Sequence, residues 1–375
     1  MVQSRIVFLS DLPTPQVLIE RTRLFRNIDR AQQLAASAGI RLRPHAKTHK
    51  SPAIAKWQIE RGAVGVCCAK LGEAEVFVDH GIADIRLPYP VNPSNADRVI
   101  ALQDRASISI IVDHHDVARG WSEAMQRANR TLDVLIKVDV GFHRCGIDPD
   151  ANPLGFVQAI ASMKGLRLRG LLSHAGHGYN VASEDEACLV AQREAEILTT
   201  LQQQAAASGI AIDEISVGAT PTLRFSVRQR GITELRPGNY VYFDRTQVAL
   251  GSATVDDCAL TVLATVVSAH PGRIILDSGS KTLTNDQARG IATSPGYGAV
   301  LRQDGTVDDT LLIERLSEEH ATVRVMGTTK LKPGDRVRIL PNHSCTVSNL
   351  MDVVRLVDGD LVVDTLPVAA RGRIQ

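Results

Sequence analysis

Basic side chains crowd into the stretch 43–50, which reads Arg-Pro-His-Ala-Lys-Thr-His-Lys. The run before it predicts a strand, and a cation buried at the end of that strand must be paired or have its pKa shifted. Neighbouring cations lower the pKa of a lysine toward the deprotonated form that attacks carbonyl groups. We therefore predict that Lys47 forms an imine with a carbonyl compound. The alternative is an exposed basic loop.

Two more histidines, His174 and His177, fall in the sequence His-Ala-Gly-His-Gly-Tyr, which ends at Tyr179. Imidazole titrates near neutral pH, so either histidine can act as a general acid or base or contact a substrate. Tyr179 is a candidate contact of a bound cofactor. The alternative is that one histidine is structural and the other is solvated.

The segment 216–222, Ser-Val-Gly-Ala-Thr-Pro-Thr, places small residues and hydroxyls directly after a predicted strand. Backbone amides and threonine hydroxyls at the start of a helix bind phosphate well. The candidate phosphate contacts are Gly218, Ala219 and Thr220. The loop 236–240 is the expected second half, and its candidate residues are Arg236, Gly238, Asn239 and Tyr240. The alternative is an ordinary helix cap at Thr222.

His343 and Cys345 are candidate metal ligands near the end of the chain. In an extended segment, residues two apart point to the same face, so both side chains could bind one ion. Imidazole with thiolate suits zinc best among the common divalent metals, and two protein ligands leave room for water and substrate. A buried cysteine beside a surface histidine is the alternative.

Composition narrows the possible functions. The chain has 375 residues and a formal net charge of +1, so it carries no electrostatic footprint for nucleic acid or an anionic membrane. Its apolar runs are too short to span a bilayer, and residues 1–10 lack the layout of a signal peptide, so a cytoplasmic location is expected. Six cysteines in a chain of this length do not predict a disulfide framework.

Short strand-like runs alternate with helix-length segments after a first helix predicted at 21–37. The predicted strands are 41–47, 64–69, 85–88, 107–113, 133–138, 168–174, 214–218 and 234–238. The predicted helices between them are 52–61, 71–80, 94–104, 115–128, 151–163, 184–208 and 221–230. Eight such repeats predict a closed (β/α)8 barrel, and no G-x-G-x-x-G supports a dinucleotide-binding fold. Barrel enzymes build their sites at the carboxyl ends of strands, where Lys47, Arg144 and His174 fall.

A second pattern begins near residue 250, where strand-like runs alternate with turns such as Pro-Gly and Asp-Gly. The predicted strands are 262–270, 273–277, 321–325, 336–340, 351–356 and 360–365. We therefore expect a barrel over 14–249 and a mostly antiparallel C-terminal β domain over 250–375, which the N-terminal strand in 1–13 could join.

Taken together, these motifs resemble the fold-type III pyridoxal-phosphate enzymes, and within them the D-serine dehydratase and D-threonine aldolase group with its alanine racemase-like barrel. The resemblance covers nearly the whole chain. Beyond the motifs already described, it rests on Asp139–Gly141, Arg144–Gly146 and Ser317–His320.

The resemblance implies that Lys47 holds pyridoxal 5'-phosphate as an imine, with Arg144 or Arg236 facing the pyridine nitrogen. It implies that phosphate is held by the loops at 218–220 and 238–240. It also implies a divalent metal at His343 and Cys345, zinc before manganese, and a homodimer with sites at the domain interface.

The two branches of this group differ at the metal pair. Aldolases carry H-x-D-P-T, whereas dehydratases acting on D-serine or D-3-hydroxyaspartate carry H-x-C, as this chain does at Cys345. The expected activity is loss of water from a D-β-hydroxy amino acid, with Lys47 as the base at Cα, to give a 2-oxo acid and ammonia. The first alternative is aldolase cleavage to glycine and an aldehyde, with His174 or His177 as base. A racemase or a non-catalytic cofactor carrier would need no metal pair.

Overall fold

The computed structural model describes residues 6–287, 289–292 and 295–375. Contacts divide the chain into two compact units, with the boundary inside the first helix. The barrel unit consists of Ala31–Lys47, Pro52–Gly238 and Gly372–Gln375. The β unit consists of the segment that ends at Arg30, Thr48–Ser51 and Asn239–Arg371. The limits 14–249 and 250–375 for functional domains stay a prediction.

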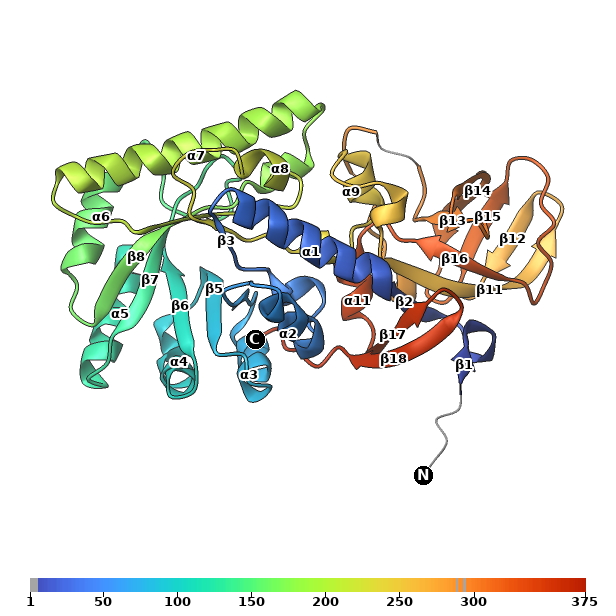
Figure 1. Cartoon of the computed structure of the whole chain (residues 1–375), viewed down its shortest axis with the longest axis horizontal. Helices are drawn as coiled ribbons and strands as arrows, with labels where there is room; N and C mark the ends of the chain where they lie inside the picture. The colour runs from blue at the N-terminus through green and yellow to red at the C-terminus, as the bar shows by residue number, and fades with distance from the viewer. Residues whose placement is uncertain (1–5, 288, 293–294) are drawn as a thin grey trace. The chain divides into compact units, whose positions relative to one another are not determined.

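Eight parallel strands form the sheet of the barrel unit, in the order β3-β10-β9-β8-β7-β6-β5-β4 (Figure 1). An isolated parallel bridge between His45 and Cys67 joins β3 to β4 and links the two ends of this order. The predicted (β/α)8 architecture is confirmed. The strands are β3 (Arg41–Leu42), β4 (Val66–Cys67), β5 (Asp84–Pro90), β6 (Ser107–Val112), β7 (Leu132–Lys137), β8 (Leu166–Leu172), β9 (Glu214–Val217) and β10 (Glu234–Leu235).

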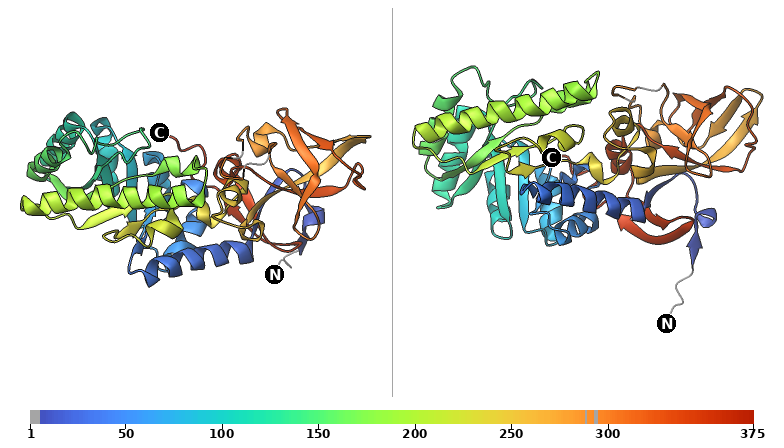
Figure 2. Two further views of the ribbon diagram at one scale, coloured as in Figure 1. Left: turned by 90° about the horizontal axis from the view of Figure 1, so that it is seen from above. Right: turned by 45° about the horizontal axis from the view of Figure 1, so that its top comes forward.

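Helices follow the strands as the apolar periodicity predicts. They are α1 (Arg21–Ser37), α2 (Pro52–Glu60), α3 (Leu71–Asp79), α4 (Ala96–Gln103), α5 (His115–Arg127), α6 (Pro153–Ser162), α7 (Glu184–Ala207) and α8 (Leu223–Ser226). Figure 2 shows α7 as the long helix beside α6 and α8. The prediction of a helix over 221–230 is wrong in extent, because α8 has four residues and the chain reaches a left-handed glycine at Gly231, φ +83°.

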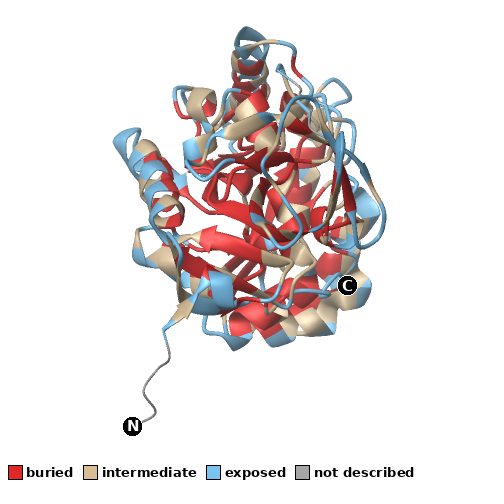
Figure 3. Cartoon of the chain, turned by 90° about the vertical axis from the view of Figure 1, so that its right-hand side faces the viewer, coloured by how far each residue is buried: buried red, intermediate tan, exposed pale blue. Residues whose placement is uncertain are grey.

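The core of the barrel unit lies on its strands. In Figure 3, buried ribbon lies toward the middle of the view and most exposed ribbon toward the outside. Ile111, Leu135 and Leu172 from β6, β7 and β8 form one fully buried cluster. Strands covered on both faces read as continuous apolar runs, which is why β6 and β7 were recognisable from the sequence.

The β unit contains a ten-stranded sheet in the order β1-β18-β17-β2-β11-β12-β15-β14-β13-β16, with β16 also pairing to β11. β1 (Val7–Phe8) pairs with β18, and β2 (Gln16–Glu20) lies between β17 and β11. The remaining strands are β11 (Leu260–His270), β12 (Arg273–Leu276), β13 (Ala299–Leu301), β14 (Val307–Leu316), β15 (Ala321–Val325), β16 (Arg336–Leu340), β17 (Val353–Asp358) and β18 (Leu361–Pro367). β13 and β14 were not predicted.

Short helices complete the β unit: α9 (Arg245–Ala249), α10 (Ser280–Leu283) and α11 (Ser344–Asn349). Single 3-10 turns lie at η2 (Ala46–Thr48), η4 (Gly176–Tyr179) and η5 (Asn239–Val241). Among the helices of the described residues, none is long and apolar enough to cross a membrane.

Candidate active site

Lys47 lies in η2, just beyond β3, and its side chain is exposed. The segment is fixed to the end of β10 by the His45 amide, which donates to the carbonyl of Pro237 at 2.9 Å. Burial lowers the pKa of His45 well below its usual value, and the charges of Lys47 and Arg236 lower it further. His45 is therefore neutral beside Lys47.

His174 follows β8, and its Nδ1–H donates to the carbonyl oxygen of Gly218 at 2.6 Å. A carbonyl only accepts, so this bond fixes the tautomer and leaves Nε2 as the basic nitrogen. Burial lowers the pKa of His174 well below its usual value, and Lys47 and Lys137 lower it further. His174 thus lies beside the 218–220 loop and near Lys47, and its imidazole is neutral.

The other three residues predicted from this side of the barrel are half-buried or exposed. His177 and Tyr179 are half-buried in η4, and burial lowers the pKa of His177. Arg144 is exposed, with its guanidinium carbon 5.1 Å from the centre of the Phe142 ring. The charge of Arg144 also lowers the pKa of His45, so these residues belong to the same electrostatic environment.

The 218–220 loop has features of an anion cradle. A Cβ on Gly218 would lie 2.9 Å from the carbonyl of Arg236, so only glycine permits this close approach of two strand ends. The Thr220 hydroxyl is buried and meets no hydrogen-bond partner within the described chain. Small residues, bare backbone and an unpartnered hydroxyl fit a phosphate group. Because α8 is so short, the cradle depends on loop amides and not on a helix dipole.

Sequence reasoning missed one buried cation in this cluster. Lys137 ends the apolar strand β7 and is 3% exposed. Burial lowers its pKa to about 7, and Arg236 contributes to that shift. A lysine at the end of an otherwise apolar buried strand is the signal that could have revealed it. We call His45, Lys47, Lys137, His174 and Arg236 the basic cluster.

The metal pair, His343 and Cys345, lies in the β unit on a helix. The prediction of an extended segment is wrong: His343 caps α11 and Cys345 is in its first turn. The cap depends on Asp244, whose Oδ2 accepts from the Ser344 amide at 2.9 Å, a partner a hundred residues away in the sequence. The two side chains still meet, because a hydrogen bond between His343 and Cys345 contributes to the pKa shifts of both.

The electrostatics of the metal pair favour an imidazolium and a thiolate. Burial opposes both charges, but the Cys345 sulfur and the Asp286 carboxylate raise the pKa of His343. His343 in turn lowers the pKa of Cys345. The Asn239 amide donates to Cys345 Sγ at 3.4 Å, and Thr48 Oγ1 lies 3.2 Å from the same sulfur. A thiolate is the form of cysteine that binds metals.

Asp286 was not found from the sequence. Its Oδ2 accepts from His343 Nδ1 at 3.1 Å and from the Thr346 hydroxyl at 2.7 Å. A carboxylate on one ring nitrogen orients a metal-binding histidine and directs its other nitrogen outward. Within the described residues, no third His, Cys, Asp or Glu joins the pair in a metal-binding group.

The remaining predicted residues divide between the units. Gly238 ends the barrel unit, whereas Asn239 and Tyr240 belong to the β unit. The Asn239 side chain donates to Asp244, Ser344 and Cys345, so it supports the metal pair. Thr48, which contacts Cys345, directly follows Lys47 in the sequence.

Comparison with known families and proteins extends these findings. Residues 19–246 match the family "Alanine racemase, N-terminal domain", and residues 259–357 match a serine dehydratase domain. A D-threo-3-hydroxyaspartate dehydratase of Delftia sp. (strain HT23) is 33% identical over 373 residues, covering 95% of this chain and 97% of that protein. A D-threonine aldolase of Arthrobacter sp is 33% identical over 369 residues, covering 97% of this chain and 94% of that protein.

A solved structure closely matches the whole chain. It is a D-threo-3-hydroxyaspartate dehydratase with a cysteine-to-alanine mutation, in the metal-free form. Its TM-score is 0.90 at 31% identity, and the match covers 96% of this chain and 98% of that one. Both sequence and fold therefore agree over nearly the full length.

Proposed function

Because the chain belongs to the alanine racemase N-terminal domain family and adds a serine dehydratase domain, we propose that it is a lyase dependent on pyridoxal 5'-phosphate and a divalent metal. Its substrate would be a D-configured β-hydroxy amino acid such as D-serine or D-3-hydroxyaspartate. The reaction eliminates water and yields a 2-oxo acid and ammonia. The observation that carries this proposal is Cys345 beside His343, which outweighs burial and lowers the pKa of the Cys345 thiol.

The basic cluster and the glycine loop fit the cofactor. The buried Thr220 hydroxyl and the close approach at Gly218 suit its phosphate, and Arg236, Gly238 and Arg144 supply further contacts. Tyr179, Asn239 and Tyr240 are proposed as additional contacts, and Lys47 Nζ as its covalent anchor. When bound, pyridoxal phosphate supplies a carbonyl for imine formation and withdraws electrons from Cα.

Proton transfer falls to Lys47 and His174. We propose that Lys47 Nζ, as a free amine, would accept the Cα proton of the substrate. His174 keeps Nε2 basic through its bond to Gly218, so it can deliver or receive a proton at the leaving group. His177 is the alternative residue for proton transfer at the leaving group.

The metal pair would hold a divalent ion, with zinc preferred and manganese as an alternative. When bound, such an ion supplies Lewis-acid stabilisation to the departing hydroxide, which is otherwise a poor leaving group. Asp286 orients His343 through its ring nitrogen, and Asn239 donates a hydrogen bond to the Cys345 sulfur. A homodimer and a cytoplasmic location complete the proposal, on the resemblance to the family.

Aldolase cleavage to glycine and an aldehyde is the second candidate function, favoured by the equally similar D-threonine aldolase. In that reaction His174 Nε2 or His177 would take the β-hydroxyl proton. The two reactions use the same residues and differ in which bond to Cα breaks. Cysteine at position 345 is what favours dehydration.

Product analysis tests the proposal. Purified protein is incubated with D-serine, D-threonine and D-3-hydroxyaspartate, each with its L-enantiomer as control, before and after chelation and with metal restored. We expect a 2-oxo acid and ammonia from a D-substrate, lost on chelation and regained with zinc or manganese. Glycine and an aldehyde would establish the aldolase instead. Turnover that survives complete metal removal would refute the role of the metal pair.

A further inference from the structure

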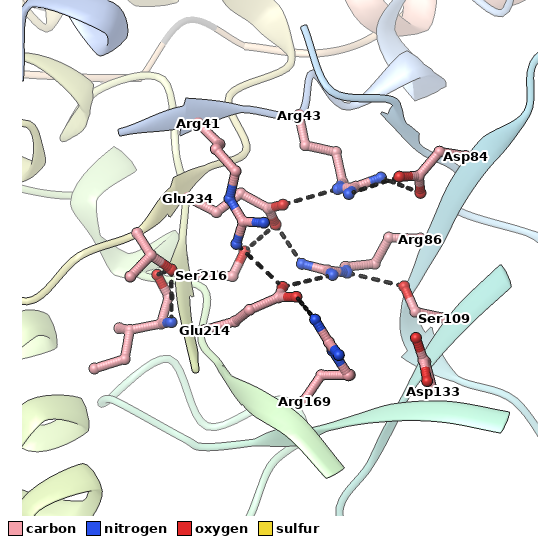
Figure 4. A network of polar contacts seen from close by, with 12 residues as sticks. Arg41, Arg43, Asp84, Arg86, Ser109, Asp133, Arg169, Glu214, Ser216 and Glu234 are labelled. Atoms are coloured by element: carbon pink, nitrogen blue, oxygen red, sulfur yellow. Dashed lines mark hydrogen bonds and ion pairs between the residues drawn. The ribbon is translucent and has the colours of Figure 1, made fainter. Parts of the chain in front are cut away.

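A buried polar network connects the strand starts of the barrel unit to Arg236. Figure 4 shows its centre, where Glu234 of β10 faces Arg43 and Arg86. The Glu234 carboxylate is fully buried, accepts from Arg43 Nε at 2.8 Å and accepts from Arg86 Nη1. Burial would raise the pKa of Glu234, but the two guanidinium groups outweigh it and lower the pKa to about 2. Glu234 is therefore ionised near neutral pH and can only accept hydrogen bonds.

Ser216 of β9 connects this carboxylate to Arg236. Its hydroxyl lies 2.6 Å from Glu234 Oε1 and 2.7 Å from Arg236 Nε. An ionised carboxylate can only accept and a guanidinium can only donate. The single Ser216 proton must therefore go to Glu234, and its oxygen must accept from Arg236. The direction of every bond in this chain is fixed.

A second arm holds the other side of Arg236. Its Nη2 donates to the carbonyl of Ser173, whose hydroxyl donates to the buried Glu194 at 2.5 Å. Nη2 also donates to the carbonyl of Ser216 at 3.3 Å. Within the described chain, none of the hydrogen bonds of Arg236 uses Nη1. The protein thus holds Nε and Nη2 of the guanidinium in place, and the two N–H groups of Nη1 remain for another acceptor.

The charge of Arg236 acts on other members of the basic cluster. Arg236 lowers the pKa of His45, Lys137 and His174, although it is a minor contributor at His174. A guanidinium that could swing away would weaken each of these effects, because they depend on distance.

We propose that Ser216 and Glu234 are positioning residues that lock the Arg236 guanidinium toward the bound cofactor. The inference rests on the proposed function, since it takes Arg236 as a cofactor contact. Glu234 sets the polarity of the Ser216 hydroxyl, and Ser216 sets the plane of the guanidinium. Neither residue needs to touch substrate or cofactor.

Ser216→Ala tests the lock, and the structure offers a matched control in Ser109→Ala. Both serines are buried, and both accept from an arginine Nε in the same network. Ser109 accepts from Arg86 at 3.0 Å, and the hydrogen bonds of Arg236 within the described residues do not include Ser109. Ser109→Ala removes one buried hydrogen bond and Ser216→Ala removes two, so both variants should lose thermal stability and the Ser216 variant should lose more. Only Ser216→Ala should disturb the cofactor.

Two readouts besides turnover are used on reconstituted protein. By fluorescence quenching, Ser216→Ala should bind pyridoxal phosphate about tenfold more weakly than wild type, the scale of one charge-assisted hydrogen bond. The pH midpoint of the bound cofactor's absorption band should rise, because a loosened cation opposes protonation less. Ser109→Ala should match wild type in both. Equal values for the two alanine variants would overturn the inference.

Glu234→Asp provides a second variant if Ser216→Ala does not fold. It keeps the charge that the two arginines require and withdraws the carboxylate from Ser216. Its midpoint should shift in the same direction, and an unchanged midpoint would count against the lock. Wild-type protein that binds no pyridoxal phosphate would refute the proposed function itself, which is a distinguishable result.

Discussion

His174 and His343 are both half-buried histidines, yet their surroundings drive them to opposite charges. His174 faces Lys47, Lys137 and Arg236, so burial and like charges act together and its pKa falls. His343 faces the Cys345 sulfur and the Asp286 carboxylate, which overcome burial and raise its pKa. The identity of the neighbours, and not the degree of burial, decides the protonation of a histidine here.

This contrast separates two chemical tasks. The basic cluster collects cations and thereby keeps its nitrogen bases neutral, as proton transfer near neutral pH requires. In the metal pair, His343 outweighs burial and lowers the pKa of Cys345, which favours the thiolate that metal binding requires. Changes to each region should therefore produce different signatures, one in the cofactor and the other in the metal.

The largest effect is expected from Lys47→Ala. Loss of the anchor and of the Cα base should reduce kcat/KM by at least about 10,000-fold, since a positioned base and a covalent anchor are removed together. The imine absorption band should be missing while the metal content stays at the wild-type level. Lys56→Ala, at an exposed lysine on α2, is the control. An imine band that persists in the Lys47 variant would place the anchor on another residue.

His343→Ala should have the next largest effect and the reverse signature. Bound zinc or manganese, measured by mass spectrometry, should be lost, and kcat should fall about 100- to 1,000-fold, the scale of Lewis-acid assistance. The cofactor spectrum should be retained. His270→Ala changes an exposed histidine of the same unit and should preserve both. Full metal occupancy in the His343 variant would remove this residue from the ligand set.

The barrel could be predicted because its information is local. Each strand is a short apolar run and each helix has an apolar stripe, so α1 was expected at 21–37 and is found at Arg21–Ser37. The strand β14 was missed because its alternation begins only at Leu311 and Ile313, after the polar start Val-Asp-Asp-Thr. Periodicity fails where an edge or entry segment is polar.

The metal pair shows what local patterns cannot give. The residue types of His343 and Cys345 were found, but α11 was not, because its first amide is capped by Asp244 from a distant loop. Asp286 is 57 residues from His343 in sequence and carries no motif of its own. In the network of Figure 4, the direction in which the Ser216 hydroxyl donates is likewise set by residues outside its own strand, Glu234 and Arg236. The residues that support a site are brought together by the tertiary structure, so sequence patterns alone do not identify them.

Asp286→Asn should sharpen the contrast with a smaller effect. Asparagine keeps the shape but not the charge opposite His343 Nδ1, so metal affinity should fall about 10- to 100-fold, as for other outer partners of metal ligands. Activity should return at higher metal concentration, and titration with zinc measures the shift. Asp304→Asn is matched, because Asp304 also accepts from a threonine hydroxyl, that of Thr306 at 2.6 Å. Unchanged metal affinity would mean that Asp286 does not orient the ligand.

The smallest effect concerns the pH dependence of stability. The folded-state pKa of His174 is lowered, so the unfolded chain binds the extra proton first as pH falls below about 6.5, the ordinary histidine value. His174 thus contributes stability above that pH and loses it on acidification, by about 1 kcal/mol between pH 6.5 and 5.5.

His174→Asn isolates this contribution, because its amide can still donate to the Gly218 carbonyl but does not titrate. Denaturant unfolding at pH 7.5, 6.5 and 5.5 should give a shallower loss of unfolding free energy than in wild type. His114→Asn, at an exposed histidine before α5, should keep the wild-type slope. If the unfolding free energy of the His174 variant changed with pH as it does in wild type, the cationic neighbours would not keep this ring neutral. The contrast with His343 would then not hold.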